Sequence, residues 1–229
     1  MSDQPVLVIT GASSGIGSAT AEAAAAAGYR LVLAARSEDK LADLASKLGG
    51  ADKAIAVACD VTSWEDNERL AATALDTFGS IDATFCNAGF GATRGWLNET
   101  PEHWRDMVLT NVLGAAYTAR AAIPALKESK GHLLLTGSIA GRRVLPGSLY
   151  SATKFAVHAM AEALRADLNG TGVRTTVIAP GMTATPFFDE QPTDALEPGD
   201  IARGVMFALS QPAHVDVNEI VIRPTSQDA

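Results

Sequence analysis

A tyrosine and a lysine stand four residues apart in the segment Tyr150-Ser151-Ala152-Thr153-Lys154. In a helix this interval places both side chains on one face, one turn apart. A free tyrosine loses its proton at roughly pH 10, and a neighbouring cation favours the phenolate and lowers that pKa. We therefore expect Lys154 to lower the pKa of Tyr150 and to make the phenol a proton donor or acceptor. The same pattern also arises by chance, as a core ring beside a solvated amine.

A serine earlier in the chain is the second candidate for chemistry. Ser138 follows the apolar run from His132 to Thr136, and ligands bind at the carboxyl ends of parallel strands. A serine hydrolase is one alternative, but Thr136-Gly137-Ser138-Ile139-Ala140 lacks the G-x-S-x-G turn, and His132 has no clear place in a catalytic triad. Ser138 is therefore a candidate for contact with a ligand, and its surroundings do not favour a hydrolase nucleophile.

A glycine-rich turn follows the first apolar run, in Thr10-Gly11-Ala12-Ser13-Ser14-Gly15-Ile16-Gly17. Glycine allows a sharp turn and a close approach of the backbone to a pyrophosphate, and the free N–H groups at the start of the next helix bind anions. The spacing G-x-x-x-G-x-G differs from the commoner G-x-G-x-x-G, and an ordinary turn is the alternative. We predict a dinucleotide site that includes Gly11, Ser13, Ser14, Gly15, Ile16 and Gly17.

The end of the second apolar run indicates which dinucleotide is bound. An acidic residue there would accept hydrogen bonds from the ribose hydroxyls of NAD, but the sequence reads Leu33-Ala34-Ala35-Arg36-Ser37. A guanidinium pairs with a phosphate through two parallel hydrogen bonds. Arg36 and Ser37 therefore favour NADP over NAD. In the alternative interpretation, Arg36 is a solvated residue at a helix start that pairs with Glu38 or Asp39.

These candidates lie among short apolar runs and longer alanine-rich stretches that alternate along the chain in βαβα order. Most of the runs are continuously apolar, as expected of parallel strands covered by helices on both faces. We predict strands at Val6 to Ile9, Leu31 to Ala34, Ala54 to Cys59, Ile81 to Cys86, His132 to Leu135, Thr175 to Ala179 and Glu219 to Ile222. We predict helices at 15–27, 38–48, 64–78, 101–128, 150–168 and 198–210. The expected fold is α/β, a Rossmann-like, doubly wound, mainly parallel seven-stranded sheet in a single domain spanning residues 1–229.

Composition excludes several classes of function. The 229 residues include 18 basic and 26 acidic side chains, giving a net charge of −8 at pH 7, which works against nucleic-acid binding. Cys59 and Cys86 are too few for a disulfide scaffold or a four-sulfur zinc site, so we expect no metal and a reduced, cytoplasmic compartment. No apolar run approaches the ~20 residues that span a bilayer, and the first residues lack a leader pattern. We therefore expect no membrane partner.

Taken together, these segments resemble the short-chain dehydrogenase/reductase family, in its compact single-domain branch. The matching motifs occur in the family's order: Thr10 to Gly17, Asp60-Val61, Asn87-Ala88-Gly89, Asn111, Ser138, Tyr150 with Lys154, and Pro180-Gly181. The resemblance implies that Tyr150 exchanges a proton with the substrate oxygen and that Ser138 holds this oxygen. It also implies that Lys154 binds the nicotinamide ribose while lowering the tyrosine pKa, and that Asn111 anchors a water for proton relay.

The resemblance implies further contacts to the cofactor. Asp60 and Val61 are expected to flank the adenine, and Thr183 and Thr185 to approach the carboxamide or the phosphates. The remaining residues expected to line the cofactor cleft are Asn87, Ala88, Gly89, Pro180 and Gly181.

Two features depart from the family pattern. Cys86 stands where the family often has an asparagine, and at a strand end we expect it to be a small buried residue. Ser138 and Tyr150 are separated by 12 positions, whereas relatives more often have one more. The loop at 141–147 is therefore one residue short, which leaves its conformation open.

The segment after Pro180-Gly181 bears on the substrate. Phe187-Phe188-Asp189-Glu190 leads within ten residues to the next helix start at Pro198, so little chain remains to cover a substrate and we expect a compact one. The final stretch, 212–225, is similar to members that act on small 3-hydroxy acids or the corresponding semialdehydes. Arg142 and Arg143 either contact an acidic substrate or are solvated. We expect the tail after Pro224 to be loose.

The sequence therefore favours an NADP-dependent oxidoreductase for a small alcohol or carbonyl substrate. A non-catalytic, NADP-sensing protein of the same fold is the alternative. Because family members usually assemble by pairing long helices, the resemblance implies a homo-oligomer, either a tetramer or a dimer, built through helices 101–128 and 150–168. The apolar positions Phe155, Ala159 and Ala163 fit such pairing, and they fit packing on the chain's own sheet equally well.

Overall fold

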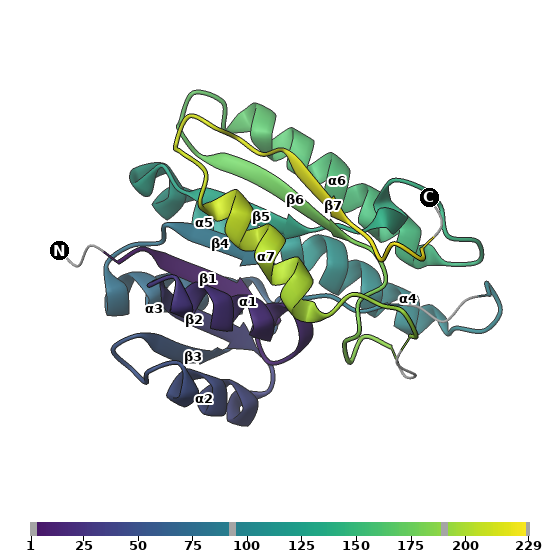
Figure 1. Ribbon diagram of the computed structural model, residues 1–229, viewed down its shortest axis with the longest axis horizontal. Helices are drawn as coiled ribbons and strands as arrows, with labels where there is room; N and C mark the ends of the chain where they lie inside the picture. The colour runs from purple at the N-terminus through teal and green to yellow at the C-terminus, as the bar shows by residue number, and fades with distance from the viewer. Residues whose placement is uncertain (1–3, 92–94, 189–191, 228–229) are drawn as a thin grey trace.

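A seven-stranded sheet forms the middle of the molecule in the computed structural model, which describes residues 4–91, 95–188 and 192–227 (Figure 1). The strands stand in the order β3-β2-β1-β4-β5-β6-β7, and every neighbouring pair is parallel. The predicted parallel sheet is confirmed, with boundaries that differ by at most two residues. The strands are β1 (Val6–Thr10), β2 (Arg30–Ala35), β3 (Ala54–Ala58), β4 (Ala83–Cys86), β5 (His132–Thr136), β6 (Arg174–Pro180) and β7 (Glu219–Ile222).

Helices cover both faces of this sheet, as the continuously apolar strands predict (Figure 1). Side chains alternate along β1, so Val6 and Val8 join one core with α3, α5 and α6, while Leu7 and Ile9 join a second core with α1, α2 and α7. The helices are α1 (Gly15–Ala26), α2 (Glu38–Lys47), α3 (Trp64–Phe78), α4 (Pro101–Val108), α5 (Ala115–Ser129), α6 (Leu149–Asp167) and α7 (Pro198–Leu209).

The long helix predicted at 101–128 is interrupted by a π-helical segment, η1 (Leu109–Gly114), so α4 and α5 are separate α-helical parts. Helical backbone angles continue through the junctions at Val108 and Ala115, so the segment widens the helix without breaking it. Single π-helical turns of this kind occur often at functional sites. Asn111, one of the predicted site residues, lies in this segment.

The order of the strands reverses at β1, which has β2 on one side and β4 on the other. Chain connections leave β1 and β4 in opposite directions, and this leaves a crevice outside the carboxyl ends of the strands. The glycine-rich turn, Asn87 and Ser138 follow β1, β4 and β5 at this edge of the sheet. The fold therefore brings the predicted motifs to one place.

Two expectations concern the segments near this edge. Asp189 and Glu190 of the expected short covering segment lie outside the described residues. The tail after Pro224 is folded back as far as Gln227, whose side-chain oxygen accepts a hydrogen bond from the Met182 N–H at 3.0 Å, so the expectation of a loose tail is wrong for these residues. In the described part of the chain, no helix is both long enough and apolar enough to cross a membrane.

Candidate active site

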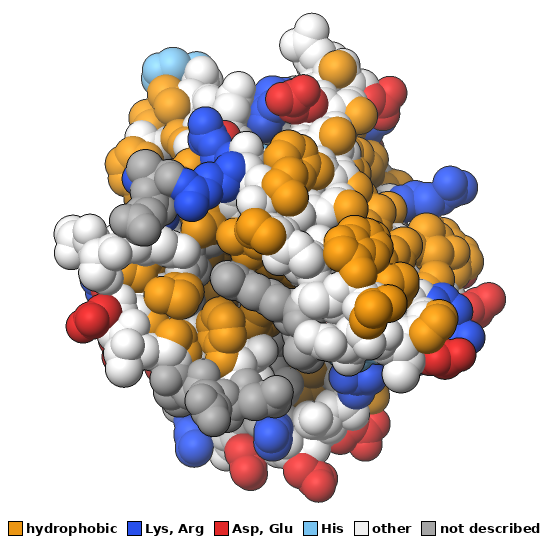
Figure 2. Space-filling model, turned by 90° about the vertical axis from the view of Figure 1, so that its right-hand side faces the viewer, with side chains coloured by type: hydrophobic (Ala, Val, Ile, Leu, Met, Phe, Trp, Pro, Cys, Tyr) orange, Lys and Arg blue, Asp and Glu red, His pale blue; other side chains and the backbone are white. Residues whose placement is uncertain are grey.

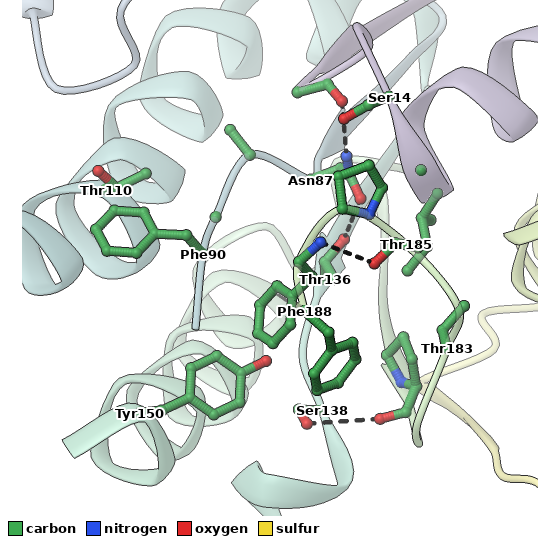
Figure 3. Close-up of a pocket in the computed structure, with 18 of the residues that line it drawn as sticks. Ser14, Asn87, Phe90, Thr110, Thr136, Ser138, Tyr150, Thr183, Thr185 and Phe188 are labelled. Atoms are coloured by element: carbon green, nitrogen blue, oxygen red, sulfur yellow. Dashed lines mark hydrogen bonds between the residues drawn. The ribbon is translucent and has the colours of Figure 1, made fainter. Parts of the chain in front are cut away.

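A cavity of about 500 Å³ opens at the carboxyl ends of the strands (Figure 3). Its lining brings together most of the residues predicted from the sequence. These are Gly11, Ser13, Ser14, Gly15, Ile16, Arg36, Ser37, Asp60, Val61, Asn87, Ala88, Gly89, Ser138, Tyr150, Lys154, Pro180, Gly181, Thr183 and Thr185. Gly17 and Asn111 are the two predicted site residues that do not line it.

The glycine-rich turn is packed too closely to accept side chains. Gly11 and Gly15 have φ angles of +66° and +54°, a region that glycine adopts without steric cost. A Cβ at Gly11 would lie 2.9 Å from the Cα of Ala88, and one at Gly15 would lie 3.1 Å from the Cβ of Thr185. The turn therefore presents backbone without side chains to the cavity, and a side chain at either glycine would collide with its neighbours.

Gly17 supports this turn from behind, and its predicted contact with the cofactor stays a prediction. A Cβ on Gly17 would collide with the carbonyl oxygen of Gly11 and come within 2.8 Å of Asn87 Nδ2. The glycine thus lets α1 pack against the turn, as the last glycine of such motifs commonly does.

Hydrogen bonds from Thr10 and Asn87 join the turn to the end of β4. The Thr10 hydroxyl accepts from the backbone N–H groups of Asn87, at 3.0 Å, and of Ala88, at 3.2 Å. Asn87 Nδ2 donates to the Thr10 carbonyl oxygen at 3.0 Å, and Asn87 Oδ1 accepts from the hydroxyl of Thr136 at 3.2 Å. Three strand ends are thereby locked together. Thr10 and Thr136 were not predicted as site residues, because their role depends on pairing across the sheet.

Arg36 and Ser37 lie at one end of the cavity, beside Cys59, Asp60 and Val61. The Arg36 side chain is exposed, and the hydrogen bonds and ion pairs of the described residues give it no partner, neither Glu38 nor Asp39. An unpaired guanidinium at the cavity rim fits the interpretation in which it meets an anionic group of a ligand. Burial raises the pKa of the neighbouring Cys59 thiol to about 12, so this cysteine is a neutral wall of the cavity.

Tyr150 and Ser138 face the same space from α6 and from the end of β5 (Figure 3). The helix that carries Tyr150 begins where the Ser148 hydroxyl accepts from the Tyr150 N–H at 3.1 Å. The shortened loop before it is closed by a hydrogen bond from the Leu145 N–H to the hydroxyl of Ser151 at 2.9 Å. One residue fewer in this loop therefore leaves the tyrosine helix in place.

The pKa of Tyr150 differs from the sequence expectation. Burial raises the pKa of the phenol above its ordinary value, and the hydrogen bond with the Ser138 side chain lowers it only in part. Lys154 Nζ lies 5.5 Å from the centre of the tyrosine ring, and burial lowers the pKa of this amine to about 8. The expected lowering by Lys154 is wrong for this structure: the group that lowers the pKa of the phenol is Ser138, and removal of the phenol from water outweighs it.

Asn111 lies behind the cavity wall. Its Nδ2 donates to the carbonyl oxygen of Phe90 at 2.9 Å and to the Thr153 hydroxyl at 3.3 Å, while its Oδ1 accepts from the Phe90 N–H at 3.0 Å. A Cβ on Gly89 would come within 2.9 Å of the same oxygen. Asn111 therefore fixes the loop after β4, and its role in proton relay stays a prediction.

A histidine that the sequence did not single out supports Ser138. His158 Nε2 accepts from the Ser138 N–H at 3.5 Å, and its Nδ1 lies 3.3 Å from Oε1 of Glu219. Arg142 donates to Oε2 of Glu219 at 2.8 Å, so its guanidinium is paired there, and neither Arg142 nor Arg143 lines the cavity. Because His158 follows Lys154 by four residues, its place on the same face of the helix was predictable from the sequence. Its contact with Glu219 depends on the fold and was not.

Comparison with known proteins decides the family. Residues 5–195 match the family model described as short chain dehydrogenase. The chain belongs to the short-chain dehydrogenase family. An uncharacterized oxidoreductase of Staphylococcus aureus strain MRSA252 is 42% identical over 224 residues, which cover 96% of each chain. The protein is accordingly an oxidoreductase of the short-chain dehydrogenase family.

Two solved structures resemble this short-chain dehydrogenase throughout. An alcohol dehydrogenase from Thermococcus sibiricus complexed with 5-hydroxy-NADP is 31% identical, with a TM-score of 0.90 and 99% of each chain covered. Serine dehydrogenase from Escherichia coli is 30% identical, with a TM-score of 0.89, and the match covers 98% of this chain and all of that one, 100%. The names of these two neighbours state different substrates: an alcohol for the first, and serine, an amino acid, for the second.

Proposed function

We propose that this short-chain dehydrogenase transfers hydride between a nicotinamide cofactor, NADP in preference to NAD, and a small substrate that carries an alcohol or carbonyl group. The observation that supports this most strongly is that Ser138, Tyr150 and Lys154 line the same cavity as the glycine-rich turn and Arg36. The bare backbone at Gly11 and Gly15 fits a pyrophosphate, and the unpaired Arg36 fits a 2′-phosphate. The structural neighbour with 5-hydroxy-NADP supports the same cofactor.

The cofactor supplies the hydride, and the residues of this chain orient the substrate and move a proton. In the reductive direction Tyr150 donates its proton to the substrate oxygen, and its raised pKa suits the phenol to stay protonated until that step. Ser138 donates a hydrogen bond to the same oxygen as negative charge develops there. A well-placed donor of this kind contributes about 2 to 4 kcal/mol to transition-state stabilisation. Lys154 would hold the ribose of the bound cofactor, and it keeps a positive charge beside the phenol ring, 5.5 Å from its centre.

Assembly and location belong to the same proposal. A groove between α5 and α6 is lined mainly by apolar side chains, including Ile123, Met160 and Leu164, and Phe155 on α6 is 41% exposed. These faces support a homo-oligomer, a dimer or tetramer, formed by pairing of the helices, as the family resemblance implies. Cys59 and Cys86 are both free and buried, which supports a reducing, cytoplasmic location.

The test of catalysis compares the wild type with Tyr150→Phe in a nicotinamide absorbance assay over alcohols, aldehydes and ketones. We expect the variant to lose about 10²- to 10⁴-fold in kcat, because the proton donor is gone, while NADPH binding measured by fluorescence stays unchanged. Equal turnover by both proteins would show that Tyr150 is misassigned. A wild type that binds NADPH and turns over no member of the panel would instead support the NADP-sensing alternative.

A further inference from the structure

Apolar side chains pack beside the Tyr150 ring, and they indicate the class of substrate. We infer that the substrate is an uncharged ketone or aldehyde, or the corresponding alcohol, with an apolar substituent, and that it is not a hydroxy acid. This inference rests on the proposed function, because it concerns the partner of the same reacting groups. It decides between the two classes that the structural neighbours represent, an alcohol and an amino acid.

Two phenylalanines pack beside the reacting phenol. The ring centres of Tyr150 and Phe187 lie 5.5 Å apart at an interplanar angle of 66°, and those of Phe187 and Phe188 lie 5.0 Å apart at 68°. Such edge-to-face stacking fixes the positions of the rings. Phe90, Ile139 and Leu145 line the same cavity. The surface offered to the part of a substrate next to the reacting carbon is therefore largely hydrocarbon.

The Phe187 ring has a defined place on this wall. A Cβ on Gly91 would lie 2.5 Å from two carbons of the ring, so the ring packs directly on the backbone after β4. The residue is still 40% exposed, which leaves part of the ring for contact with a ligand. Burial of an alkyl or aryl group against it would be favourable by the ordinary hydrophobic effect.

The cations among the described lining residues either follow a different strand from Ser138 or are hydrogen-bonded to the main chain. The charged side chains among the described lining residues are Arg36, Asp60 and Lys154. Arg36 follows β2, which lies three positions from β5 in the sheet, and Asp60 follows the neighbouring strand β3. Lys154 Nζ donates to the Thr136 carbonyl oxygen at 2.7 Å. A carboxylate placed beside Phe187 would lose its hydration without gaining an ion pair, which is costly.

Two further basic side chains in the described part of the chain, Arg142 and His103, each have a carboxylate beside them. Arg142 is paired with Glu219 at 2.8 Å, and His103 lies 3.4 Å from a carboxylate oxygen of Glu99. Neither residue lines the cavity. Figure 2 views the molecule from the side to which the carboxyl ends of the strands point, and many of the side chains on this face are hydrophobic.

Matched substrates test the charge preference directly. Ethyl 4-oxopentanoate and 4-oxopentanoate carry the same reacting ketone and differ in charge and in the ester's ethyl group. 2-Butanone and 2-octanone differ only in alkyl length and measure the effect of added hydrocarbon alone. With NADPH, we expect kcat/KM for the ester to exceed that for the acid by about tenfold or more, because the anion would have no partner in the site. We expect 2-octanone to exceed 2-butanone by a similar factor of about ten, because it buries more hydrocarbon.

A charge introduced into the wall provides a second test with a matched control. Leu145→Arg places a cation in the cavity lining, whereas Val144→Arg adds the same charge to a neighbouring side chain that is 68% exposed and does not line the cavity. Leu145→Arg is expected to lower the ester-to-acid ratio by about tenfold, by providing the missing ion pair. Val144→Arg is expected to leave it within about twofold, because an exposed cation outside the cavity lining is screened by water and salt. If Leu145→Arg fails to fold, the ester-to-acid and 2-octanone-to-2-butanone ratios of the wild type test the inference by themselves.

The outcomes separate this inference from the proposed function. Faster turnover of 4-oxopentanoate or of serine than of the neutral compounds would overturn the apolar-substrate inference and leave the oxidoreductase proposal standing. An ester-to-acid ratio near one would overturn it as well. If no neutral or acidic compound is turned over in either direction, both proposals fail.

Discussion

The side-chain nitrogen of Lys154 lies 2.7 Å from the main-chain carbonyl oxygen of Thr136. The lysine is 4% exposed, and burial lowers its pKa to about 8, which still leaves the amine protonated at neutral pH. The contact ties α6 to the last residue of β5, so Tyr150 on the helix and Ser138 beyond the strand are held at a fixed separation. The lysine therefore has a structural and an electrostatic role at once.

Lys154→Met is expected to abolish most activity and to change how stability depends on pH. Because the folded-state pKa lies below that of a free lysine, the unfolded chain binds more protons between about pH 8 and pH 10. Stability of the ligand-free wild type should therefore gain from this group as pH rises through that range. Urea unfolding across the range measures the gain, which Met at this position should remove. An identical pH dependence in both proteins would contradict the buried, titrating amine.

Arg36→Ala is expected to weaken NADPH binding by about 10- to 100-fold, the range of a lost charge-assisted hydrogen bond, and to leave NADH binding nearly unchanged. The physical reason is that only NADPH carries the 2′-phosphate that an unpaired guanidinium can meet. Fluorescence titration with both cofactors measures the two constants. Arg143→Ala is the matched control, because Arg143 is exposed and outside the cavity. An equal loss for NADH and NADPH would contradict the assignment.

His158 is expected to position Ser138 only in its neutral form, in which Nε2 accepts the Ser138 N–H. Burial, with smaller contributions from Arg142 and Lys154, lowers the pKa of His158 against the opposing effects of Glu219 and of the Ser138 backbone. Protonation of His158 at a pH below the ordinary histidine pKa would convert Nε2 from an acceptor into a donor. We therefore expect kcat to fall at acidic pH.

The matching variants are His158→Leu and His158→Gln. The leucine variant should lose about tenfold in kcat with little change in KM for NADPH, the effect of one unsatisfied backbone donor. The glutamine variant keeps an acceptor and should retain most of the activity, but without the acidic decline. Equal kcat values for the two variants would show that His158 acts only by filling space.

Local patterns predicted much of this fold and site, because each depends on residues close together in sequence. The strands, the glycine-rich turn and the Tyr150–Lys154 spacing are of this kind. The contributions of His158, Phe187 and Gln227 were not predictable, since each depends on contacts made across the fold, such as that between Gln227 and Met182. The pKa of Tyr150 was predicted wrongly because charge spacing can be read from a sequence, whereas the depth of burial cannot.

His132 is expected to lower the stability of the folded chain in acid. This role differs from that of a catalytic-triad histidine, for which the sequence offers it no clear place. Its side chain is 1% exposed on β5, Nε2 lies 2.7 Å from the Thr176 hydroxyl, and burial lowers its pKa to about 3. A folded-state pKa below the free value means that the unfolded chain binds the proton first as pH falls. The contribution of His132 to the free energy of unfolding is therefore fully present above about pH 6.5 and is lost as the pH falls towards 3.

Urea unfolding between pH 7 and pH 4 tests this expectation on wild type and His132→Leu. The wild type should lose up to about 1.4 kcal/mol per pH unit from this histidine, the cost of one proton taken up only by the unfolded chain. The leucine variant should lack that decline even if its stability at neutral pH is lower through loss of the Thr176 contact. His214→Leu, at an exposed position, should keep the wild-type slope. If His132→Leu shows the same slope as the wild type, the acid sensitivity arises from another group and His132 is protonated in the folded chain.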